Sequence, residues 1–265
     1  EPIWNYIVAY RGDTFDINTT QVAVTREGGF TPVRFEYSYD FHYNNLKKSE
    51  AQREKNKVTN FMQTVTAPAR LAGQILLVHE YADQIANPRS AWTYNPGQRR
   101  VRLAPNIAYD NDWKLVGKKE IYVPYNSYRL NSPKLKYTDI VRPGHINPEH
   151  ARYELHRVWV VDATLKAGTS HIYQRRTFYI DEDSWNILAV DKYDTRGQLW
   201  RVAEQHSAQA YDIPAIGPGV EVHHDLQSGR FLAMGMTNEE STVYVRTNRS
   251  AADFSPSSLR GAGTR

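Results

Sequence analysis

Two long runs of alternating side chains constrain the fold of this chain more than any other feature. The first is FTPVRFEYSYDFHYN at 30–44, and the second is RYELHRVWVVDATLKAG at 152–168. Successive side chains of a strand point to opposite faces of a sheet, so each run predicts a long strand with one apolar face. The apolar positions are Val33, Phe35, Tyr37, Tyr39, Phe41 and Tyr43 in the first run, and Tyr153, Leu155, Trp159, Val161, Ala163 and Leu165 in the second. The polar positions of the first run, Arg34, Glu36, Ser38, Asp40, His42 and Asn44, are predicted to face water.

Shorter runs of the same kind fill most of the remaining chain. They are separated by turn sequences such as Glu-Gly-Gly at 27–29 and Gln-Ser-Gly at 227–229. About eleven strands at even spacing predict a mainly β fold, with one antiparallel sheet, mostly up-and-down, in a single domain over 1–265. Helical periodicity is predicted for 1–12, and a short helical turn is predicted in a frayed tail at 250–265. These two segments and the turn-rich 134–151 region could cover a face of the sheet. Segment 44–57 has almost no apolar residue and is predicted to be a mobile connection or a short solvated helix.

Composition excludes several classes of function. The chain has 265 residues, of which 33 are basic and 29 acidic, and the net charge of +4 is ordinary for a soluble protein, so no nucleic acid partner is predicted. Cysteine is absent, which excludes disulfides, zinc-thiolate sites and a cysteine nucleophile. No apolar run is long enough for a membrane-spanning helix. The sequence opens at Glu1 and Pro2, so we expect a mature or trimmed form with its signal peptide removed.

The stretch RRTFYIDEDSW at 175–185 places three adjacent carboxylates between apolar flanks. A calcium loop counted from Asp181 would need Gly at the sixth position and Glu at the twelfth, where this chain has Asn186 and Lys192. The trio is therefore predicted to be the solvated turn of a hairpin. HExxH, GxSxG and phosphate-loop motifs are also absent, and His223 and His224 would point to opposite faces of a strand. No catalytic residue, metal site or cofactor is predicted, although the spacing of the acids leaves a two-carboxylate hydrolase open.

The apolar face of the predicted sheet is large, and few helices are available to cover it. A strongly curved sheet with helices on its concave side would leave a groove for a hydrophobic ligand, whereas a fully packed core would leave none. Both alternatives stay open on the sequence. The residues predicted to face such a groove are Phe35, Tyr37, Tyr39, Phe41, Leu155, Trp159 and Val161.

Several motifs, in order along nearly the whole chain, resemble a known family. They include QTVTAPARLAGQILLVHE, AWTYNPGQRRVRLAPNIAYDN, PGHINPEHARYELHRVWVVDATLKAG and HIYQRRTFYIDEDSWNILAVDKYDTRGQLWRV. The family is the bacterial domain of unknown function 1329, which is described as outer-membrane lipoprotein-sorting-like and is similar to the lipoprotein carriers LolA and LolB. This resemblance implies an unclosed (half) β-barrel of about eleven antiparallel strands with a few short helices on its concave side.

The resemblance also implies a location and a partner. Family members belong to the periplasm or outer-membrane surface of Gram-negative bacteria, and their genes often lie beside exporters of the resistance-nodulation-division (RND) type. Members usually have a longer N-terminus, a longer loop near 111–112 and a different 44–57 region, so segments of this chain are expected to be missing there.

Three hypotheses follow. The leading one is a periplasmic, non-enzymatic carrier of a lipid or other hydrophobic molecule that works with an RND-type exporter and makes peripheral membrane contact. The second is a structural adaptor that docks to an exporter or an outer-membrane protein without cargo. The third is a glycan- or lipid-modifying hydrolase.

Overall fold

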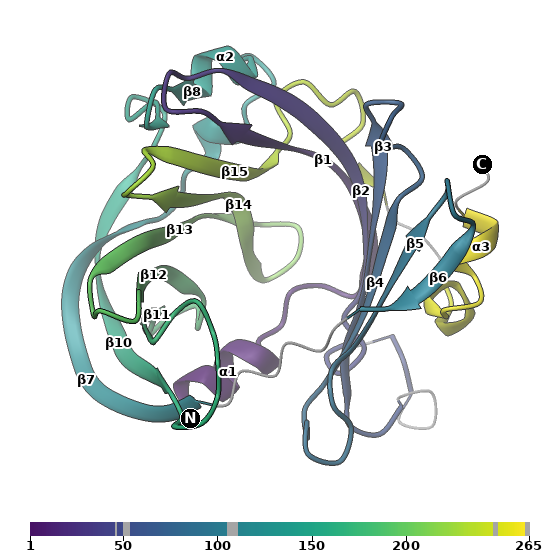
Figure 1. The fold of residues 1–265 in the computed structure, drawn as a ribbon, viewed down its shortest axis with the longest axis horizontal. Helices are drawn as coiled ribbons and strands as arrows, with labels where there is room; N and C mark the ends of the chain where they lie inside the picture. Colours follow the sequence, from purple (N-terminus) through teal and green to yellow (C-terminus); the bar gives the residue numbers. More distant parts are fainter. Residues whose placement is uncertain (46, 50–53, 105–110, 246–248, 263–265) are drawn as a thin grey trace. The chain divides into compact units, whose positions relative to one another are not determined.

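The computed structural model describes residues 1–45, 47–49, 54–104, 111–245 and 249–262, and shows a mainly β chain with a few short helices (Figure 1). The helical segments are α1 (Pro2–Val8), η2 (Tyr128–Asn131), α2 (Tyr137–Ile140), η3 (Ala251–Phe254) and α3 (Leu259–Ala262). The strands are β1 (Thr14–Val24), β2 (Phe30–Asp40), β3 (Lys57–Ala67), β4 (Ile75–Tyr81), β5 (Ser90–Asn95), β6 (Arg100–Leu103), β7 (Asn111–Pro124), β8 (Val141–Arg142), β9 (His145–Ile146), β10 (Tyr153–Leu165), β11 (Arg175–Asp181), β12 (Ile187–Tyr193), β13 (Leu199–Ala210), β14 (Ala215–Asp225), β15 (Arg230–Met236) and β16 (Tyr244–Val245).

One large antiparallel sheet contains most of these strands. Among the described residues it has fourteen strands, in the order β6-β5-β4-β3-β2-β1-β15-β14-β13-β12-β11-β10-β7, with β16 paired to β1. Strands β6 and β7 end this order, so the sheet is not closed. The predicted fold class is confirmed. The strand count is modestly higher than the predicted eleven or so.

Contacts divide the chain into two compact units, which are described separately below. The first unit contains Glu1–Ala9, Gln21–Thr31 and Ala108–Glu239, and the second contains Tyr10–Thr20, Pro32–Ile107 and Glu240–Arg265. The single-domain assignment of the sequence analysis stays a prediction. None of the helices in the described part of the chain is long and apolar enough to span a membrane.

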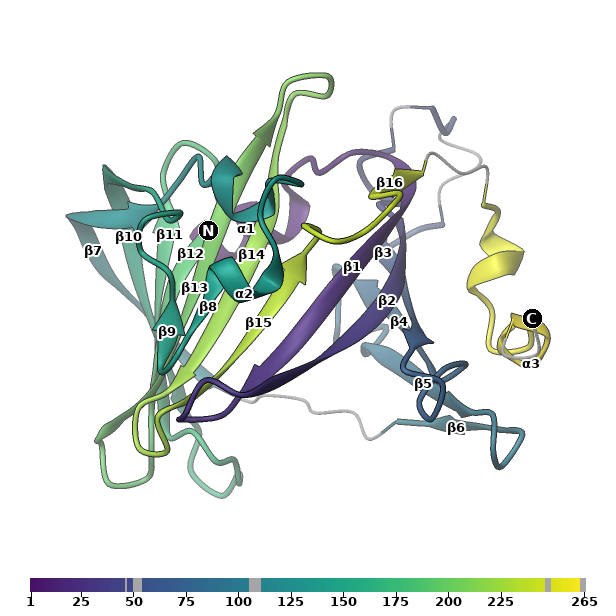
Figure 2. The same ribbon diagram turned by 90° about the horizontal axis from the view of Figure 1, so that it is seen from above.

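In the first unit, the segment between β7 and β10 covers one face of β14 and β15. Leu130, Ile140 and Ile146 from this segment are almost fully buried and pack with Val222 and Phe231 of the sheet. Figure 2 shows α2 and β8 over these strands. Because a short helix has little stability by itself, this apolar packing is what holds α2 in place.

The second unit uses the chain's C-terminal residues to cover one face of its strands. Phe254 of η3 and Leu259 of α3 are 1% and 0% exposed and pack on Met62, Leu77 and Tyr94. Figure 1 shows α3 beside β5 and β6. The predicted short helical turn is present, but 250–262 is not frayed, because two large apolar side chains anchor it. Residues 263–265 lie outside the described part.

The polar face of β2 also differs from the prediction. Ser38 and Asp40 are each 1% exposed, and His42, just beyond the strand, is 2% exposed. Alternation identified the two faces correctly, but the face predicted to meet water is largely buried at these positions. Sequence period alone cannot tell a solvated polar row from a buried one whose members hydrogen-bond to one another.

Two further segments depart from the sequence predictions. Helix α1 ends at Val8 instead of continuing to residue 12, because Ala9 already has an extended backbone, with ψ of 140°. In segment 44–57, residues 46 and 50–53 lie outside the described part, and the described remainder forms turns before β3 begins at Lys57. Asn45 and Lys57 are buried there, which a wholly solvated connection does not account for.

Candidate functional site

The largest cluster of contacting aromatic rings lies in the second unit, on β1, β2 and β3 and directly after β2. We name it the aromatic surface. It consists of Phe15, Phe35, Tyr37, Tyr39, Phe41 and Phe61. Tyr39 is its centre: its ring centroid is 5.2 Å from that of Phe15, 5.4 Å from that of Phe41 and 4.9 Å from that of Phe61. Tyr37 joins through Phe61, at 5.4 Å between centroids.

Strand register explains why these rings meet. Tyr39 lies directly opposite Phe61 in the pairing of β2 with β3, and Tyr37 is two residues along on the same face. Directly opposed aromatic side chains stabilise a strand pair, so the sheet itself holds the rings in one layer. Tyr37 is buried, whereas Phe15, Tyr39, Phe41 and Phe61 keep part of their surface exposed.

The aromatic surface is on the opposite face of these strands from the C-terminal helices. Met62, the neighbour of Phe61 in β3, packs with Phe254, and alternation turns Phe61 away from that contact. Further apolar residues extend the surface beside Phe35, with Val65 buried and Ile17, Val33 and Leu71 partly buried. This face therefore combines rigid rings with residual exposure, which is what a hydrophobic ligand needs to bind.

The structure brings together four of the seven predicted site residues. Phe35, Tyr37 and Tyr39 share one face of β2, and Phe41 follows directly and stacks on Tyr39 with an angle of 3° between the rings. Phe15 and Phe61 were missed by the sequence analysis. The alternation in VTNFMQTV could have indicated Phe61, but only the pairing of strands reveals that Phe15 joins it.

The other three predicted residues lie on β10 in the first unit. Val161 is 5% exposed and Leu155 is 58% exposed, so they meet very different surroundings. Trp159 is partly buried, with the Lys118 ammonium 4.3 Å from its ring centroid. Trp159 and Val161 share a face of β10, directly opposite Ile180 and Phe178 of β11.

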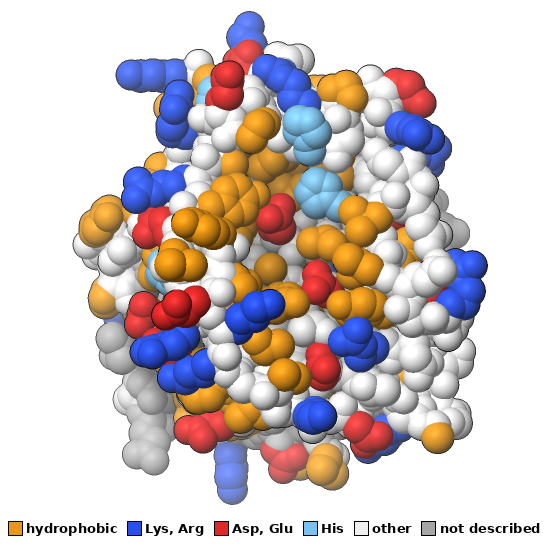
Figure 3. Space-filling model, turned by 90° about the vertical axis from the view of Figure 1, so that its left-hand side faces the viewer, with side chains coloured by type: hydrophobic (Ala, Val, Ile, Leu, Met, Phe, Trp, Pro, Cys, Tyr) orange, Lys and Arg blue, Asp and Glu red, His pale blue; other side chains and the backbone are white. Residues whose placement is uncertain are grey.

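Figure 3 looks at the side of the molecule on which β7 and β10 lie in Figure 1. Hydrophobic side chains gather across the middle of this face, with charged side chains among and around them. Exposed apolar residues are concentrated on β7, where Trp113, Leu115 and Tyr122 are 52%, 53% and 72% exposed. Single exposed apolar residues need no explanation, but several on one strand indicate a surface that contacts something apolar.

The acidic trio does form the turn of the β11–β12 hairpin, as predicted. The Trp185 amide donates to the Asp181 carbonyl at 3.0 Å, and the Asp181 amide donates to the Asn186 carbonyl at 2.9 Å. The trio is not wholly solvated, however, because Asp181 is 0% exposed. Its carboxylate accepts from His156 Nδ1 at 2.8 Å and from the Ser184 amide and hydroxyl at 2.9 and 2.6 Å.

The remaining members of the trio also have structural surroundings. Glu182 forms ion pairs with Lys118 and Arg157, each at 2.6 Å. Hydrogen bonds from Arg157 and Lys118 lower the pKa of Glu182 to about 2. Asp183 is exposed. These contacts fix the turn between two hairpin strands and leave Asp183 as the carboxylate most open to solvent.

One group in the described part of the chain has the composition of a metal site. His156, Asp181 and Asp183 each offer a ligand atom, and these atoms lie within 4.8 Å of one another. Asp181 already accepts hydrogen bonds at both oxygens, from His156 and Ser184. Those bonds account for its burial without an ion, so the group is explained by the turn that it stabilises.

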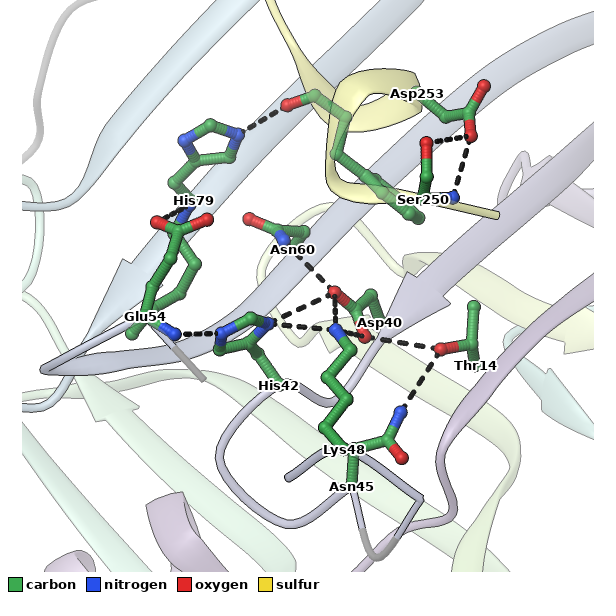
Figure 4. Close-up of polar contacts among 12 residues, drawn as sticks. Thr14, Asp40, His42, Asn45, Lys48, Glu54, Asn60, His79, Ser250 and Asp253 are labelled. Carbon is green, nitrogen blue, oxygen red and sulfur yellow. Dashed lines mark hydrogen bonds and ion pairs between the residues drawn. The ribbon is translucent and has the colours of Figure 1, made fainter. Parts of the chain in front are cut away.

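Figure 4 shows a polar network around the buried Asp40. Because Asp40 is the neighbour of Tyr39 in β2, its side chain points to the face opposite the aromatic surface. Asp40 accepts from Lys48 Nζ at 2.8 Å on both oxygens, from Asn60 at 3.2 Å and from Thr14 at 3.1 Å. Burial alone would raise the pKa of Asp40, but hydrogen bonds from His42 and Lys48 hold it well below its usual range. The network therefore keeps Asp40 ionised, and it provides structural support beneath the aromatic surface.

A second polar cluster lies in the first unit. The Tyr153 hydroxyl donates to Glu204 at 3.1 Å, and His224 Nε2 lies 3.7 Å from the same carboxylate. His206 is 0% exposed, and burial lowers its pKa to about 4, which makes it neutral at physiological pH. A neutral, fully enclosed imidazole cannot reach a substrate, so this cluster is structural as it stands.

Comparison with known proteins shows which family this arrangement belongs to. The family model for "Protein of unknown function (DUF1329)" matches residues 1–112 and 111–260. An uncharacterized protein of Pseudomonas aeruginosa is 48% identical over 290 aligned residues, which cover 100% of this chain and 64% of that protein. The chain thus spans less than two thirds of its relative's length.

Solved structures resemble the chain in fold. A Vibrio parahaemolyticus domain with a proposed outer membrane lipoprotein-sorting role has a TM-score of 0.59 at 11% identity, over 94% of this chain and 92% of that one. A DUF1329 family protein from Desulfovibrio piger has a TM-score of 0.57 at 14% identity, over 92% and 91%. A LolA superfamily protein from Nitrosomonas europaea has a TM-score of 0.54 at 12% identity, over 96% and 94%. The fold is therefore LolA-like, and the chain belongs to the DUF1329 family.

Proposed function

We propose that this chain is a non-enzymatic carrier that binds a lipid or another hydrophobic molecule in the periplasm. The observation that carries the proposal is the aromatic surface, in which four of six contacting rings keep part of their area exposed. The proposed binding residues of the second unit are Phe35, Tyr37, Tyr39 and Phe41, with Phe15 and Phe61 added. Those of the first unit are Leu155, Trp159 and Val161. The likeness to a LolA superfamily protein and to a domain with a proposed lipoprotein-sorting role supports the same class of function.

The energetics suit a protein that must also release its ligand. Each methylene group removed from water contributes about 0.8 kcal/mol, so a chain of roughly 14 carbons offers on the order of 10 kcal/mol before other costs. Ordering the ligand and losing its free motion offset several kcal/mol of that gain. The net affinity then falls in a range where transfer to a partner is feasible, and we propose an RND-type exporter or an outer-membrane component as that partner.

The aromatic surface is tested with Phe61→Ala. Removing this ring takes away contacts to the ligand, and we expect the affinity for the uncharged fluorophore N-phenylnaphthylamine to fall about tenfold, which corresponds to about 1.4 kcal/mol. Fluorescence titration of the purified chain measures the change. Phe61→Trp keeps a large ring and should keep the affinity. Tyr211→Ala removes an exposed ring of the other unit, away from the proposed binding residues, as a matched control.

Two results would contradict the proposed site. One is an unchanged affinity in a folded Phe61→Ala protein. The other is an equal loss in Tyr211→Ala, which would mean that the dye binds exposed rings without selection. Mass spectrometry of lipids that co-purify with the chain from native membranes is an independent check, and we expect a lipid to be present in stoichiometric amount.

A structural adaptor is a second candidate, favoured by β7. This strand ends the sheet order and exposes Trp113, Leu115 and Tyr122. Such a strand is suited to docking against an exporter or an outer-membrane protein. If the chain is an adaptor only, Leu115→Lys will abolish recovery of the membrane partner in a pull-down, and no hydrophobic probe will bind to the unchanged chain. A carrier is expected to bind the probe in the unchanged chain, with or without a membrane partner.

A further inference from the structure

Three cations stand side by side across the first unit's sheet. Arg176 of β11 lies directly opposite Lys192 of β12, and Lys192 lies directly opposite Arg201 of β13. Side chains at directly opposite positions of paired strands point to the same face, so all three share one face of the sheet. We name these three residues the cation row. Arg175, the neighbour of Arg176, points to the other face, where it contacts Thr177 at 2.9 Å and Asp162 at 3.4 Å.

A single tyrosine lies at the centre of the cation row. The centroid of the Tyr173 ring is 5.5 Å from the Arg176 guanidinium carbon, 5.8 Å from Lys192 Nζ and 5.9 Å from the Arg201 guanidinium carbon. Arg201 also donates to the Tyr173 hydroxyl at 2.9 Å. Tyr173 is held in turn by Trp200, whose ring centroid is 5.7 Å away. All three positive charges therefore lie within 6 Å of the centre of one aromatic ring, to which cations are attracted.

Carboxylates lie near Arg201 and Lys192. Arg201 pairs with Asp225 at 3.0 Å, and Asp225 is its directly opposite neighbour on β14. Burial and the charges of Arg176 and Arg201 lower the pKa of Lys192, and Glu221 opposes this only in part. Like charges placed directly opposite each other destabilise a sheet, so this arrangement has a cost that a bound anion would remove.

An apolar row runs beside the cation row on the same face, and each of its members is two residues away from a cation on the same strand. Phe178 lies directly opposite Val190, and Val190 lies directly opposite Ala203. Val161 of β10 continues this row as the partner of Phe178. Phe178 and Val190 are partly exposed, and the Trp113 ring centroid lies 5.7 Å from that of Phe178. The face therefore offers a line of positive charge next to a line of apolar surface.

We propose that the cation row binds the phosphate or carboxylate headgroup of an anionic amphiphile, whose hydrocarbon chain lies along Val161, Phe178 and Val190. Arginine guanidinium groups bind such oxygens through paired N–H donors, and Lys192 adds a point charge between them. The inference deepens the proposed carrier function and rests on it, because the apolar row matters only if the chain binds a hydrophobic molecule. It adds a chemical class to the ligand: one end is negatively charged.

The test compares an anionic probe with an uncharged one of the same length. We expect the unchanged chain to bind decyl phosphate, below its critical micelle concentration, at least tenfold more tightly than decanol in calorimetric titrations. Lys192→Met and Arg176→Gln should each remove most of that preference and leave decanol binding unchanged. Lys192→Arg should retain the preference. Arg175→Gln removes an equal charge from the adjacent position on the opposite face and should leave both affinities unchanged.

Other results of these titrations would contradict either the headgroup site or the carrier proposal. If decanol and decyl phosphate bind equally well, the headgroup site is wrong while the carrier proposal stands. If neither probe binds, the carrier proposal itself fails. If inorganic phosphate binds as tightly as decyl phosphate, the row binds a free anion and the amphiphile assignment is overturned. If Arg175→Gln weakens decyl phosphate as much as Lys192→Met does, the effect is one of net charge and the cation row is not a site.

Thermal unfolding without ligand separates a binding role from a structural one. If Lys192 serves to bind an anion, removing its positive charge from beside Arg176 and Arg201 should not destabilise the fold. Lys192→Met should then unfold at the same temperature as the unchanged chain or at a temperature higher by on the order of 2 °C. Decyl phosphate should then raise the unfolding temperature of the unchanged chain more than that of the variant. A Lys192→Met protein that unfolds at a clearly lower temperature would show that Lys192 stabilises the fold through Tyr173, and this would overturn the proposal.

Discussion

Replacing Phe254 by alanine is expected to lower the free energy of unfolding by about 3–5 kcal/mol, the range for truncating a large buried aromatic side chain. Phe254 is 1% exposed and packs among Met62, Leu77 and Leu259. Its loss would leave a cavity against the strands and would also loosen η3 and α3, which are too short to be stable alone. Urea denaturation followed by circular dichroism measures the change, with a lower midpoint and a similar slope expected.

The control for this prediction keeps the volume of the side chain. Phe254→Leu should cost less than about 1.5 kcal/mol, because an apolar residue of comparable size can refill the site. The backbone contact between His79 Nε2 and the Phe254 carbonyl, at 2.7 Å, is present in both variants and so does not contribute to the difference. A loss below about 1 kcal/mol in Phe254→Ala would contradict the packing of the C-terminal residues on this sheet.

The alternation of side chains predicted where the long strands lie better than it predicted which of their faces are covered. Strand β10 and the aromatic strand β2 follow from the sequence directly, since a period of two has one structural meaning over eleven or more residues. The sequence could not show which face would be covered. Phe254 and Leu259 determine the covered face, because they pack on Met62 of β3 and Leu77 of β4. These contacts join distant parts of the chain, since His79 and Phe254, for example, are 175 residues apart.

The candidate site was also predictable only in part. Phe35, Tyr37, Tyr39 and Phe41 are successive members of one alternating run, so their shared face was predictable. Phe15 and Phe61 belong to other strands, and the cation row needs the register of β11, β12 and β13 before Arg176, Lys192 and Arg201 become neighbours. Register is set by turn lengths and bulges, such as the shift between Tyr179 and Ile180, and these leave little trace in a single sequence.

The buried network around Asp40 carries the other large expected effect. Asp40→Asn removes the charge that compensates Lys48 while keeping the size of the side chain. Breaking a buried ion pair costs about 3–5 kcal/mol, and we expect the lower end, about 3 kcal/mol, since the Lys48 side chain is 23% exposed. Thermal unfolding at neutral pH measures the loss. Lys48→Met combined with Asp40→Asn should lose less than the two single changes added together, because the pair is then removed as a whole.

The pH dependence of this difference tests the ionisation of Asp40 itself. Hydrogen bonds and the charge of Lys48 hold the pKa of Asp40 below its ordinary value of 3.8 in the folded chain. The stability that ionised Asp40 contributes is therefore fully present above the unfolded pKa and is lost as the pH falls through the folded one. The gap in unfolding temperature between the unchanged chain and Asp40→Asn should be constant from about pH 8 to pH 5 and should narrow below about pH 4. Other carboxylates titrate in both proteins and cancel in the difference, so a gap that stays constant down to about pH 2 would mean that the Asp40 charge does not stabilise the fold.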